Sequence, residues 1–344
     1  MPKRLLFWLV PLLGPAAALA QLPAPMTARD SALHALNRLA YGPRPGEIDS
    51  VARLGVNRWI ESQLAAQESE PELKSAERGF DLLKLSPDDL ARRAVEMQKE
   101  RRRDKQRGED QEDRRHDRKH GADDPRRLAA QFQQLVVTRA VLARNQLQEV
   151  MADFWTNHFN VVLTKGADRY LLPGYVERTI RPHALGSFED LLLAVARSPA
   201  MLFYLDNVRS VAPGSAPPAL RNARFRRFMS PRVDSLEAKL PTGINENYAR
   251  ELLELHTLGV DGGYTQQDVI NTARILTGWS MERPERGAGF EFHDWAHDMG
   301  EKVVLGVRFP MGHGQDEGEK LLRMLAQHPA TMHHISAKLC QRFV

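Results

Sequence analysis

The chain has 344 residues, a single cysteine and a formal net charge of +4. One cysteine excludes an intrachain disulfide, so the packing of apolar side chains must hold the fold. Residues 91–127 carry 14 lysines and arginines against 10 aspartates and glutamates, which already equals the net charge of the whole chain. The remaining residues therefore lack the basic surface that nucleic-acid binding requires, and no nucleic-acid partner is expected.

The first twenty residues have the pattern of a secretory signal peptide. Lys3 and Arg4 precede an apolar run from Leu5 to Leu13, and Ala18-Leu19-Ala20 is a small-x-small cleavage site. The run is about half the length that spans a bilayer. These features predict a signal peptide at 1–20 and an exported helical domain at 21–344, periplasmic or extracellular. An uncleaved anchor is the alternative, and no transmembrane segment is expected after cleavage.

The first half of the chain has the apolar spacing of helices. We expect one helix that stops at Gly42-Pro43, a second over Ile48–Ile60 and a long third from about Leu128 to Phe159. Between the second and the third lies the charged insertion 91–127. Its charges have mixed signs and it contains almost no apolar residues, which predicts a solvated helix or a disordered insertion.

The second half continues with capped helices. Ser187 and Asp190 form a capping-box-like start, Asn245 caps the segment "ENYARELLELHTL", and Thr265 with Asp268 caps the next. Residues 208–242 are rich in proline, serine and arginine and predict a long loop. The fold class expected is therefore all-α, with a small β element near residues 289–307.

The chain is expected to close with a helical pair. The two segments are "GEKLLRMLAQH" and "PATMHHISAKLCQRFV". Cys340 lies between Leu339 and Phe343 on an apolar face, so we expect it to be buried rather than nucleophilic. The sequence stops in or just after this last helix without a polar cap, which suggests a truncated C-terminus.

The segment "MADFWTNHFNV" contains the first candidate residues, His158 and its neighbour Asn157. Leu147, Met151, Phe154 and His158 are spaced at i, i+4, i+7 and i+11, so His158 faces the core. A buried histidine of this kind is either hydrogen-bonded to a carbonyl or functional. Burial among rings would keep its imidazole neutral, which suits a metal ligand or a base.

The segment "NENYARELLELHTLG" contains the second group. On a straight helix Asn247, Arg250, Glu251 and Glu254 lie within one arc, whereas Leu255 and His256 lie on the opposite side. Two carboxylates one turn apart beside a guanidinium can bind a divalent cation or a cationic group. They can equally be a solvated stripe of charges on a surface helix.

The segment "HDWAHDMG" contains the third group. His293 and His297 are four residues apart and each is followed by an aspartate, but Asp298 and Gly300 next to strand-like segments favour a loop. Histidine and aspartate are common metal ligands, so His297 and Asp298 are candidates for a metal site.

Six segments occur in an order that resembles a known family. They are "LNRLAYGPRPGEI", "FWTNHF", "ALGSFEDLLLAVARSPAMLFYLDN", "NENYARELLELHTLGVDGGYTQQDVINTARILTGW", "HDMGEKVVLG" and "HPATMHHISAKLCQRFV". Together they resemble the bacterial family catalogued as domain of unknown function 1800. The resemblance implies an exported, largely helical protein that is longer at its C-terminus than this chain. It also implies a partner, because such proteins are often encoded beside an exported, sulfatase-like family, domain of unknown function 1501.

The residues and the resemblance together lead to two functional hypotheses. The first is a metal-dependent enzyme, most simply a hydrolase, with an oxidoreductase at a redox metal as the other reaction. Its divalent metal ion would be zinc, iron or manganese. The second is a non-catalytic envelope protein that binds or matures a partner such as the sulfatase-like protein.

The metal-site hypothesis assigns a role to each residue. His158, His297 and Asp298 would be ligands, Glu251 or Glu254 a ligand or general base, and Arg250 the contact for an anionic substrate group. The further candidates are Asn157, Asn247 and His256. His158 is then expected within roughly 4–6 Å of at least one of the other predicted ligands or carboxylates.

Overall fold

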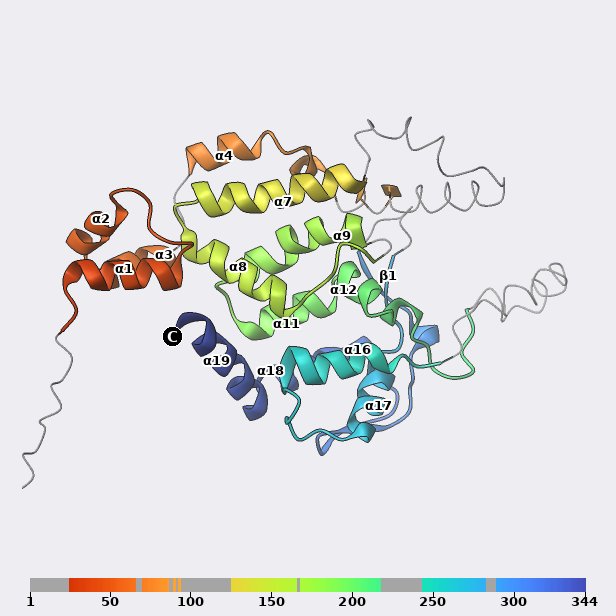
Figure 1. Cartoon of the computed structure of the whole chain (residues 1–344). Helices are drawn as coiled ribbons and strands as arrows, with labels where there is room; N and C mark the ends of the chain where they lie inside the picture. The colour runs from red at the N-terminus through yellow and green to blue at the C-terminus, as the bar shows by residue number, and fades with distance from the viewer. Residues whose placement is uncertain are drawn as a thin grey trace, which may run out of the picture.

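The computed structural model describes residues 25–65, 70–86, 89–90, 92–93, 125–165, 168–217, 243–282 and 289–344. Over these residues the protein is all-α with two small two-stranded sheets (Figure 1). The predicted signal peptide, most of the charged insertion 91–127 and most of the loop 208–242 lie outside the described residues. Within the described part, a search for helices long and apolar enough to cross a bilayer finds none.

The three N-terminal helices have a core cluster of their own. They are α1 (Ala28–Leu39), α2 (Glu47–Leu54) and α3 (Val56–Leu64), and they pack around Leu36, Val51 and Trp59. The helix expected over Ile48–Ile60 is in fact two helices. Gly55 separates them, because its backbone has φ 91°, a left-handed conformation that favours glycine, and its N–H closes α2 on the Val51 carbonyl at 2.8 Å.

The single long helix expected from Leu128 to Phe159 is wrong. The structure has α7 (Pro125–Leu142) followed by α8 (Gln146–His158). Asn145 caps α8, because its side chain accepts the backbone N–H of Gln148 at 3.4 Å. The carboxylate of Glu70 accepts the backbone N–H groups of Arg144 and Asn145, which lie between the two helices. The break is thus stabilised by side chains that apolar spacing does not reveal.

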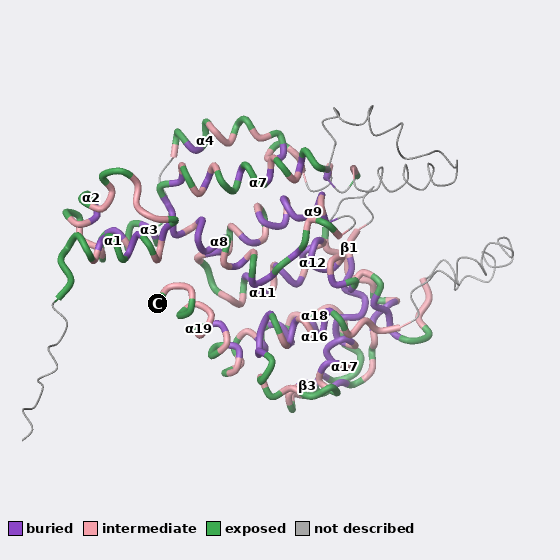
Figure 2. The backbone as a smooth tube through the Cα atoms, viewed as in Figure 1, coloured by how far each residue is buried: buried purple, intermediate pink, exposed green. Residues whose placement is uncertain are grey.

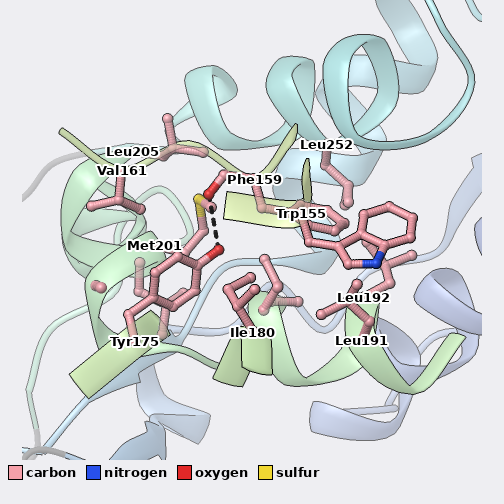
Figure 3. Packing of buried hydrophobic residues seen from close by; sticks show 14 of the residues in the cluster. Trp155, Phe159, Val161, Tyr175, Ile180, Leu191, Leu192, Met201, Leu205 and Leu252 are labelled. Carbon is pink, nitrogen blue, oxygen red and sulfur yellow. Dashed lines mark hydrogen bonds between the residues drawn. The ribbon is translucent and has the colours of Figure 1, made fainter. Parts of the chain in front are cut away.

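The main core lies between α8 and helices that come both before and after it in the chain. Those elements are α4 (Pro71–Glu77), η1 (Asp81–Lys84), α9 (Asp168–Tyr175), η3 (Val176–Ile180), α10 (Arg181–His183), α11 (Phe188–Ala196), α12 (Pro199–Tyr204) and η4 (Asn207–Arg209). Figure 3 shows Trp155 of α8 and Phe159, the residue directly after α8, packed among Ile180, Leu191 and Leu252. The predicted cap at Ser187 is confirmed, since its side chain accepts the Asp190 N–H at 3.1 Å.

The polar groups of this core are satisfied internally. The Tyr175 hydroxyl donates to the Phe159 carbonyl at 2.9 Å, which Figure 3 marks with a dashed line. The Trp155 indole N–H donates to the Ala184 carbonyl at 3.0 Å. Figure 2 shows the same region as an almost continuous buried band through α8, α11 and α12. The core therefore fixes the backbone of α8 up to its last residue, His158.

The two capped segments of the second half form as predicted. Asn245 caps α16 (Glu246–Glu251), and Thr265 with Asp268 makes a capping box at the start of α17 (Gln266–Ile275). Between α16 and the turn at Gly259 the chain is not α-helical. It forms the π-helical segment η5 (Leu252–Thr257).

Two short hairpins and two helices complete the fold. β1 (Trp279–Met281) pairs antiparallel with β2 (Phe290–Phe292), and β3 (Lys302–Val304) with β4 (Val307–Phe309). The short helix η6 (Asp294–Ala296) joins the hairpins, and α18 (Gln315–Ala326) and α19 (Pro329–Phe343) follow. The β element predicted near 289–307 is therefore present, and β1 and β4 extend it on both sides.

Cys340 is exposed, so the prediction that it is buried is wrong. The buried residues of α19 are Thr331 and Ile335. Cys340 follows Ile335 by five positions, which turns it away from that inward face. Leu339 and Phe343, four residues apart, pack on the main core, and Cys340 lies beside that stripe rather than on it.

Candidate functional site

The π-helical segment η5 sets the orientation of His256. Its last turn is closed by the Leu258 N–H on the Leu253 carbonyl at 2.8 Å, and the Thr257 hydroxyl donates to the Leu252 carbonyl at 2.6 Å. The wider turn leaves Leu255 48% exposed and buries His256. Leu255, which was expected on the same side as His256, is thus largely exposed while His256 is buried. π-Helical turns of this kind occur frequently at functional sites.

His158 lies at the end of α8 inside a box of aromatic rings. Its ring centroid is 4.5 Å from Phe159, 5.6 Å from Trp155 and 6.5 Å from Phe188. Only 7% of the residue is exposed. The inward position predicted from the spacing of α8 is therefore confirmed.

Both ring nitrogens of His158 have polar partners. Nε2 is 3.1 Å from the backbone carbonyl oxygen of His256, and Nδ1 is 3.0 Å from Nζ of Lys338 in α19. A carbonyl oxygen can only accept, so Nε2 carries the proton of a neutral imidazole and Nδ1 accepts from the lysine. The two contacts connect α8, η5 and α19 at one point.

Burial controls the protonation of these groups. It lowers the pKa of His158 to about 3 and that of His256 to about 3, and the nearby positive charge of Lys338 acts in the same direction. Burial also lowers the pKa of Lys338 below its ordinary value. The two imidazoles are therefore neutral at neutral pH, and the lysine is a stronger acid than an exposed one.

A third histidine completes what we term the histidine–lysine cluster: His158, His256, His334 and Lys338. The ring of His158 is 6.3 Å from that of His256 and 6.2 Å from that of His334. Burial lowers the pKa of His334 as well. Nδ1 of His256 and Nε2 of His334 are buried and have no hydrogen-bond partner among the described residues. These two nitrogens could therefore form hydrogen bonds to a bound molecule.

Gly259 is required for this arrangement. It ends η5 with φ +86°, and a Cβ built on it would lie 3.0 Å from Nδ1 of His334. Any other residue would be strained in its backbone and would press on the imidazole. The glycine that terminates the helix therefore also gives His334 its place in the cluster.

A second polar group surrounds His297. Nζ of Lys302 is 2.6 Å from Oε2 of Glu317, Nε2 of His297 is 3.3 Å from the same oxygen, and all three side chains are at most 2% exposed. Nδ1 of His297 donates to the Thr277 carbonyl oxygen at 2.8 Å. This is a buried ion pair with a histidine against it, and it joins β3 to α18.

Asp298 is bound in a separate ion pair next to that group. Arg274 of α17 donates through Nε to Oδ2 at 2.7 Å, and the Gly300 N–H donates to Oδ1 at 2.8 Å. Burial raises the pKa of Asp298, but these two hydrogen bonds outweigh it and the net shift is downward. Asp298 is therefore an ionised carboxylate with its acceptor sites occupied.

The predicted carboxylate stripe lies on the outer side of α16 and η5. The Tyr264 hydroxyl donates to Oε2 of Glu254 at 3.0 Å, and Arg250 donates to Oε1 of Gln266 at 2.8 Å. Burial, then the charge of Glu254, raise the pKa of Glu251. His256 lies on the other side of the same helix, as predicted.

The two predicted amide candidates have local structural contacts. The side chain of Asn157 donates to the Asp153 carbonyl at 2.9 Å, and Asn157 itself is exposed. The backbone N–H of Asn247 donates to the capping side chain of Asn245 at 2.9 Å. Neither contact joins these residues to the histidine–lysine cluster.

Residues 34–344 match the sequence model of a family described as a protein of unknown function, DUF1800. The chain belongs to this family. Comparisons of this DUF1800 member with the curated proteins and with the solved structures found no match. The histidine–lysine cluster, the His297 group and the carboxylate stripe all lie within the part that the DUF1800 model matches.

The structure does not bring the predicted metal ligands together. The hydrogen bonds of His158 go to η5 and α19. Those of His297 and Asp298 go to Thr277 between α17 and β1, to α17 itself and to the segment next to β3. In the described ranges, no group of three or more histidine, cysteine, aspartate or glutamate side chains has the arrangement to hold a metal ion. The expected partners of His158 are replaced by a carbonyl oxygen and a lysine.

Sequence reasoning missed four of the residues that the structure gathers. His334 and Lys338 are one helical turn apart in "HHISAKLC", and that spacing could have identified them as a pair on one face. Lys302 and Glu317 carry no such signal. They are 15 positions apart in different elements, and only the folded chain puts them in contact.

Proposed function

We propose that this DUF1800 member is an exported hydrolase in which Lys338 is the proton donor and His158 positions it. The observation that carries the proposal is the hydrogen bond from Nζ of Lys338 to Nδ1 of His158. The partner of this half-buried ammonium is a neutral imidazole and not a carboxylate. An ammonium has three N–H donors, so two remain for a substrate.

The chemistry follows from the charge of these groups. Water attacks the electrophilic centre of an ester or amide, the bond to the leaving oxygen or nitrogen breaks, and the leaving group takes a proton from Nζ of Lys338. The proton lost by the attacking water returns Lys338 to its ammonium form. A lysine whose pKa is lowered by burial is a better proton donor near neutral pH than an exposed lysine.

The other members of the cluster support this role by position. The His256 carbonyl holds the tautomer of His158 that leaves Nδ1 free to accept, as a triad orients its histidine. His334 lies one turn before Lys338 on α19, with an unpartnered ring nitrogen inside the site. The signal-like pattern of residues 1–20 favours a reaction outside the cytoplasm.

The first test measures the acidity of Lys338 directly. Lysines are labelled with a trace of acetic anhydride across pH 6–11 and quantified by mass spectrometry. Lys338 is expected to become reactive at a lower pH than Lys320, an exposed lysine on α18. A Lys338 that titrates together with Lys320 would overturn the proposal.

The second test measures hydrolysis. The protein is screened against chromogenic esters, amides, phosphate esters and sulfate esters, and any activity is compared in Lys338→Met and in the control Lys320→Met. Loss of activity in the first variant alone is the expected result. Equal activity in wild type and Lys338→Met would assign the reaction to other residues, with the Glu251 and Glu254 stripe as the next to be tested.

A further inference from the structure

We propose that α19 contains an anion-binding site, formed by Lys338 and Arg342, which takes an oxyanion group of the substrate. The chemical class is a carboxylate, phosphate or sulfate. The assignment of the anion to a substrate rests on the proposed hydrolase function, but the binding of an anion to these two residues does not.

The two cations lie on one face of the helix. His334, Lys338 and Arg342 follow each other at intervals of four residues, so their side chains are neighbours along α19. Lys338 contacts His158 at the end of α8. Arg342 lies close enough to Tyr41 for its charge to favour the phenolate, although burial and nearby carboxylates raise the pKa of Tyr41 to about 12.

Tyr41 connects this end of the stripe to α8. Its hydroxyl is 3.4 Å from the Glu149 carbonyl oxygen, and its backbone N–H donates to Gln146 at 3.3 Å. The stripe on α19 therefore meets α8 at Lys338, and its Arg342 end lies towards Tyr41, just after α1. A ligand between them would be bordered by Tyr41 at one end and His158 at the other.

Neither cation has a carboxylate partner. Both side chains are half-buried, and no ion pair joins either of them to a carboxylate in the part of the chain that the structure describes. The hydrogen bond of Lys338 goes to a neutral ring, and the guanidinium of Arg342 lies 5.5 Å from the ring of Phe343. Partly desolvated cations without counter-charges attract an anion that can accept their free N–H groups.

The nearest carboxylates are engaged elsewhere. Glu149 receives both arms of the Arg181 guanidinium, one of them at 2.9 Å. The carboxylate of Asp153 accepts the Asn157 amide at 3.3 Å and belongs to an exposed residue. Of the two described carboxylates that act on Tyr41, Asp153 is thus the one that can compete for Arg342, and removing its charge is expected to strengthen anion binding.

Anion binding is tested by calorimetric titration with inorganic phosphate, sulfate and acetate at constant ionic strength, with chloride as the reference salt. The wild type is expected to bind at least one oxyanion more tightly than chloride. Arg342→Gln and Lys338→Met are each expected to weaken that binding by roughly tenfold or more, the scale of one charge-assisted contact. Arg342→Lys should retain part of it.

The matched control is Arg323→Gln on the adjacent helix α18. Arg323 is also exposed in part, but its guanidinium donates to Glu189 at 2.8 Å, so its charge is already paired. Its replacement should leave phosphate binding unchanged. Absence of oxyanion binding in the wild type, or equal binding in wild type, Arg342→Gln and Lys338→Met, would overturn the anion site.

The two proposals fail in different ways. If phosphate binds as expected but Lys338→Met hydrolyses every substrate as fast as the wild type, the anion site stands and the hydrolase proposal falls. If Lys338→Met loses hydrolysis but phosphate binds equally well to wild type, Lys338→Met and Arg342→Gln, the hydrolase proposal stands and the anion site falls. A folded state common to all variants is verified by their far-UV circular dichroism.

Discussion

Nζ of Lys338 lies 3.0 Å from Nδ1 of His158, and the two residues are 180 positions apart in the chain. The contact joins the last helix to the aromatic box at the end of α8. Because the other nitrogen of His158 is held by the His256 carbonyl, the imidazole has one orientation and one tautomer. A single ring therefore fixes the relative positions of three helices, and its replacement has measurable consequences.

Replacing His158 with leucine should destabilise the protein. Leucine fills much of the same volume but leaves the His256 carbonyl without a donor and the Lys338 ammonium without an acceptor. The expected loss is about 1–3 kcal/mol in the free energy of unfolding, measured by urea denaturation. Asn157→Ala, at the exposed neighbouring position, should change it by less than about 0.5 kcal/mol. Equal stability of both variants would contradict a structural role for the two hydrogen bonds.

The stability of the protein should fall between pH 6.5 and pH 4.5. His158 and His256 have pKa values lowered to about 3 in the folded protein, below the unfolded value of about 6.5. Their contribution is complete above pH 6.5 and is lost as the pH falls, because the unfolded chain binds the protons. Each histidine contributes a slope of roughly 1.4 kcal/mol per pH unit.

Urea titrations at pH 7.5, 6.5, 5.5 and 4.5 measure that slope. His256→Phe should reduce it by roughly 1.4 kcal/mol per pH unit, because the contribution of one buried imidazole is removed. The pKa of Asp298 is lowered, so the stability that this carboxylate contributes is lost only at more acidic pH and does not affect the slope between pH 6.5 and pH 4.5. A slope that is the same in wild type and His256→Phe would show that other groups titrate there.

Replacing Glu317 with glutamine should be among the most damaging changes. The substitution leaves the buried ammonium of Lys302 without its counter-charge, which costs about 3–5 kcal/mol. The matched control is Glu319→Gln, two residues further along α18, whose partner Arg197 is much more exposed. That control should cost less than about 1 kcal/mol. The melting temperatures of the two variants distinguish the cases, and a mild Glu317→Gln would mean that water reaches the pair.

Replacing Glu251 with glutamine should raise stability slightly. Burial and the charge of Glu254 raise the pKa of Glu251, so its ionised form is disfavoured in the folded protein. The wild type should accordingly gain stability as the pH falls through that raised pKa, and the variant should not. The expected gain at pH 7 is less than about 1 kcal/mol by urea denaturation. A destabilised variant would indicate that the attraction of Arg250 for the Glu251 carboxylate outweighs burial and the charge of Glu254.

The sequence predicts elements better than it predicts contacts. The caps at Ser187, Asn245 and Thr265 form as expected because each depends on residues two or three positions apart. The side of α8 that faces the core could be predicted equally well, because it follows from the helical period. In both cases the information lies within one or two turns of the chain.

The candidate site depends on information of another kind. His158 was identified, but its partner Lys338 was not, because no local pattern links positions so far apart. The predicted companions His297 and Asp298 instead enter ion-pair networks with Glu317 and Arg274. The residue types correctly suggested side chains that could bind or react at these positions. Which of these side chains come into contact is decided by the packing of α18 and α19, and the sequence does not show it.

The segment η5 is a local insertion in the helical register. A π-helical turn accommodates one residue more than the α-helical turn it replaces. If the same residues formed a regular α-helix from Glu246 onwards, without the wider turn, every later side chain would be rotated by about 100°. His256 would leave the core and Gly259 would no longer face His334. The extra residue held in this one wider turn is thus as specific a determinant of the site as any of its side chains.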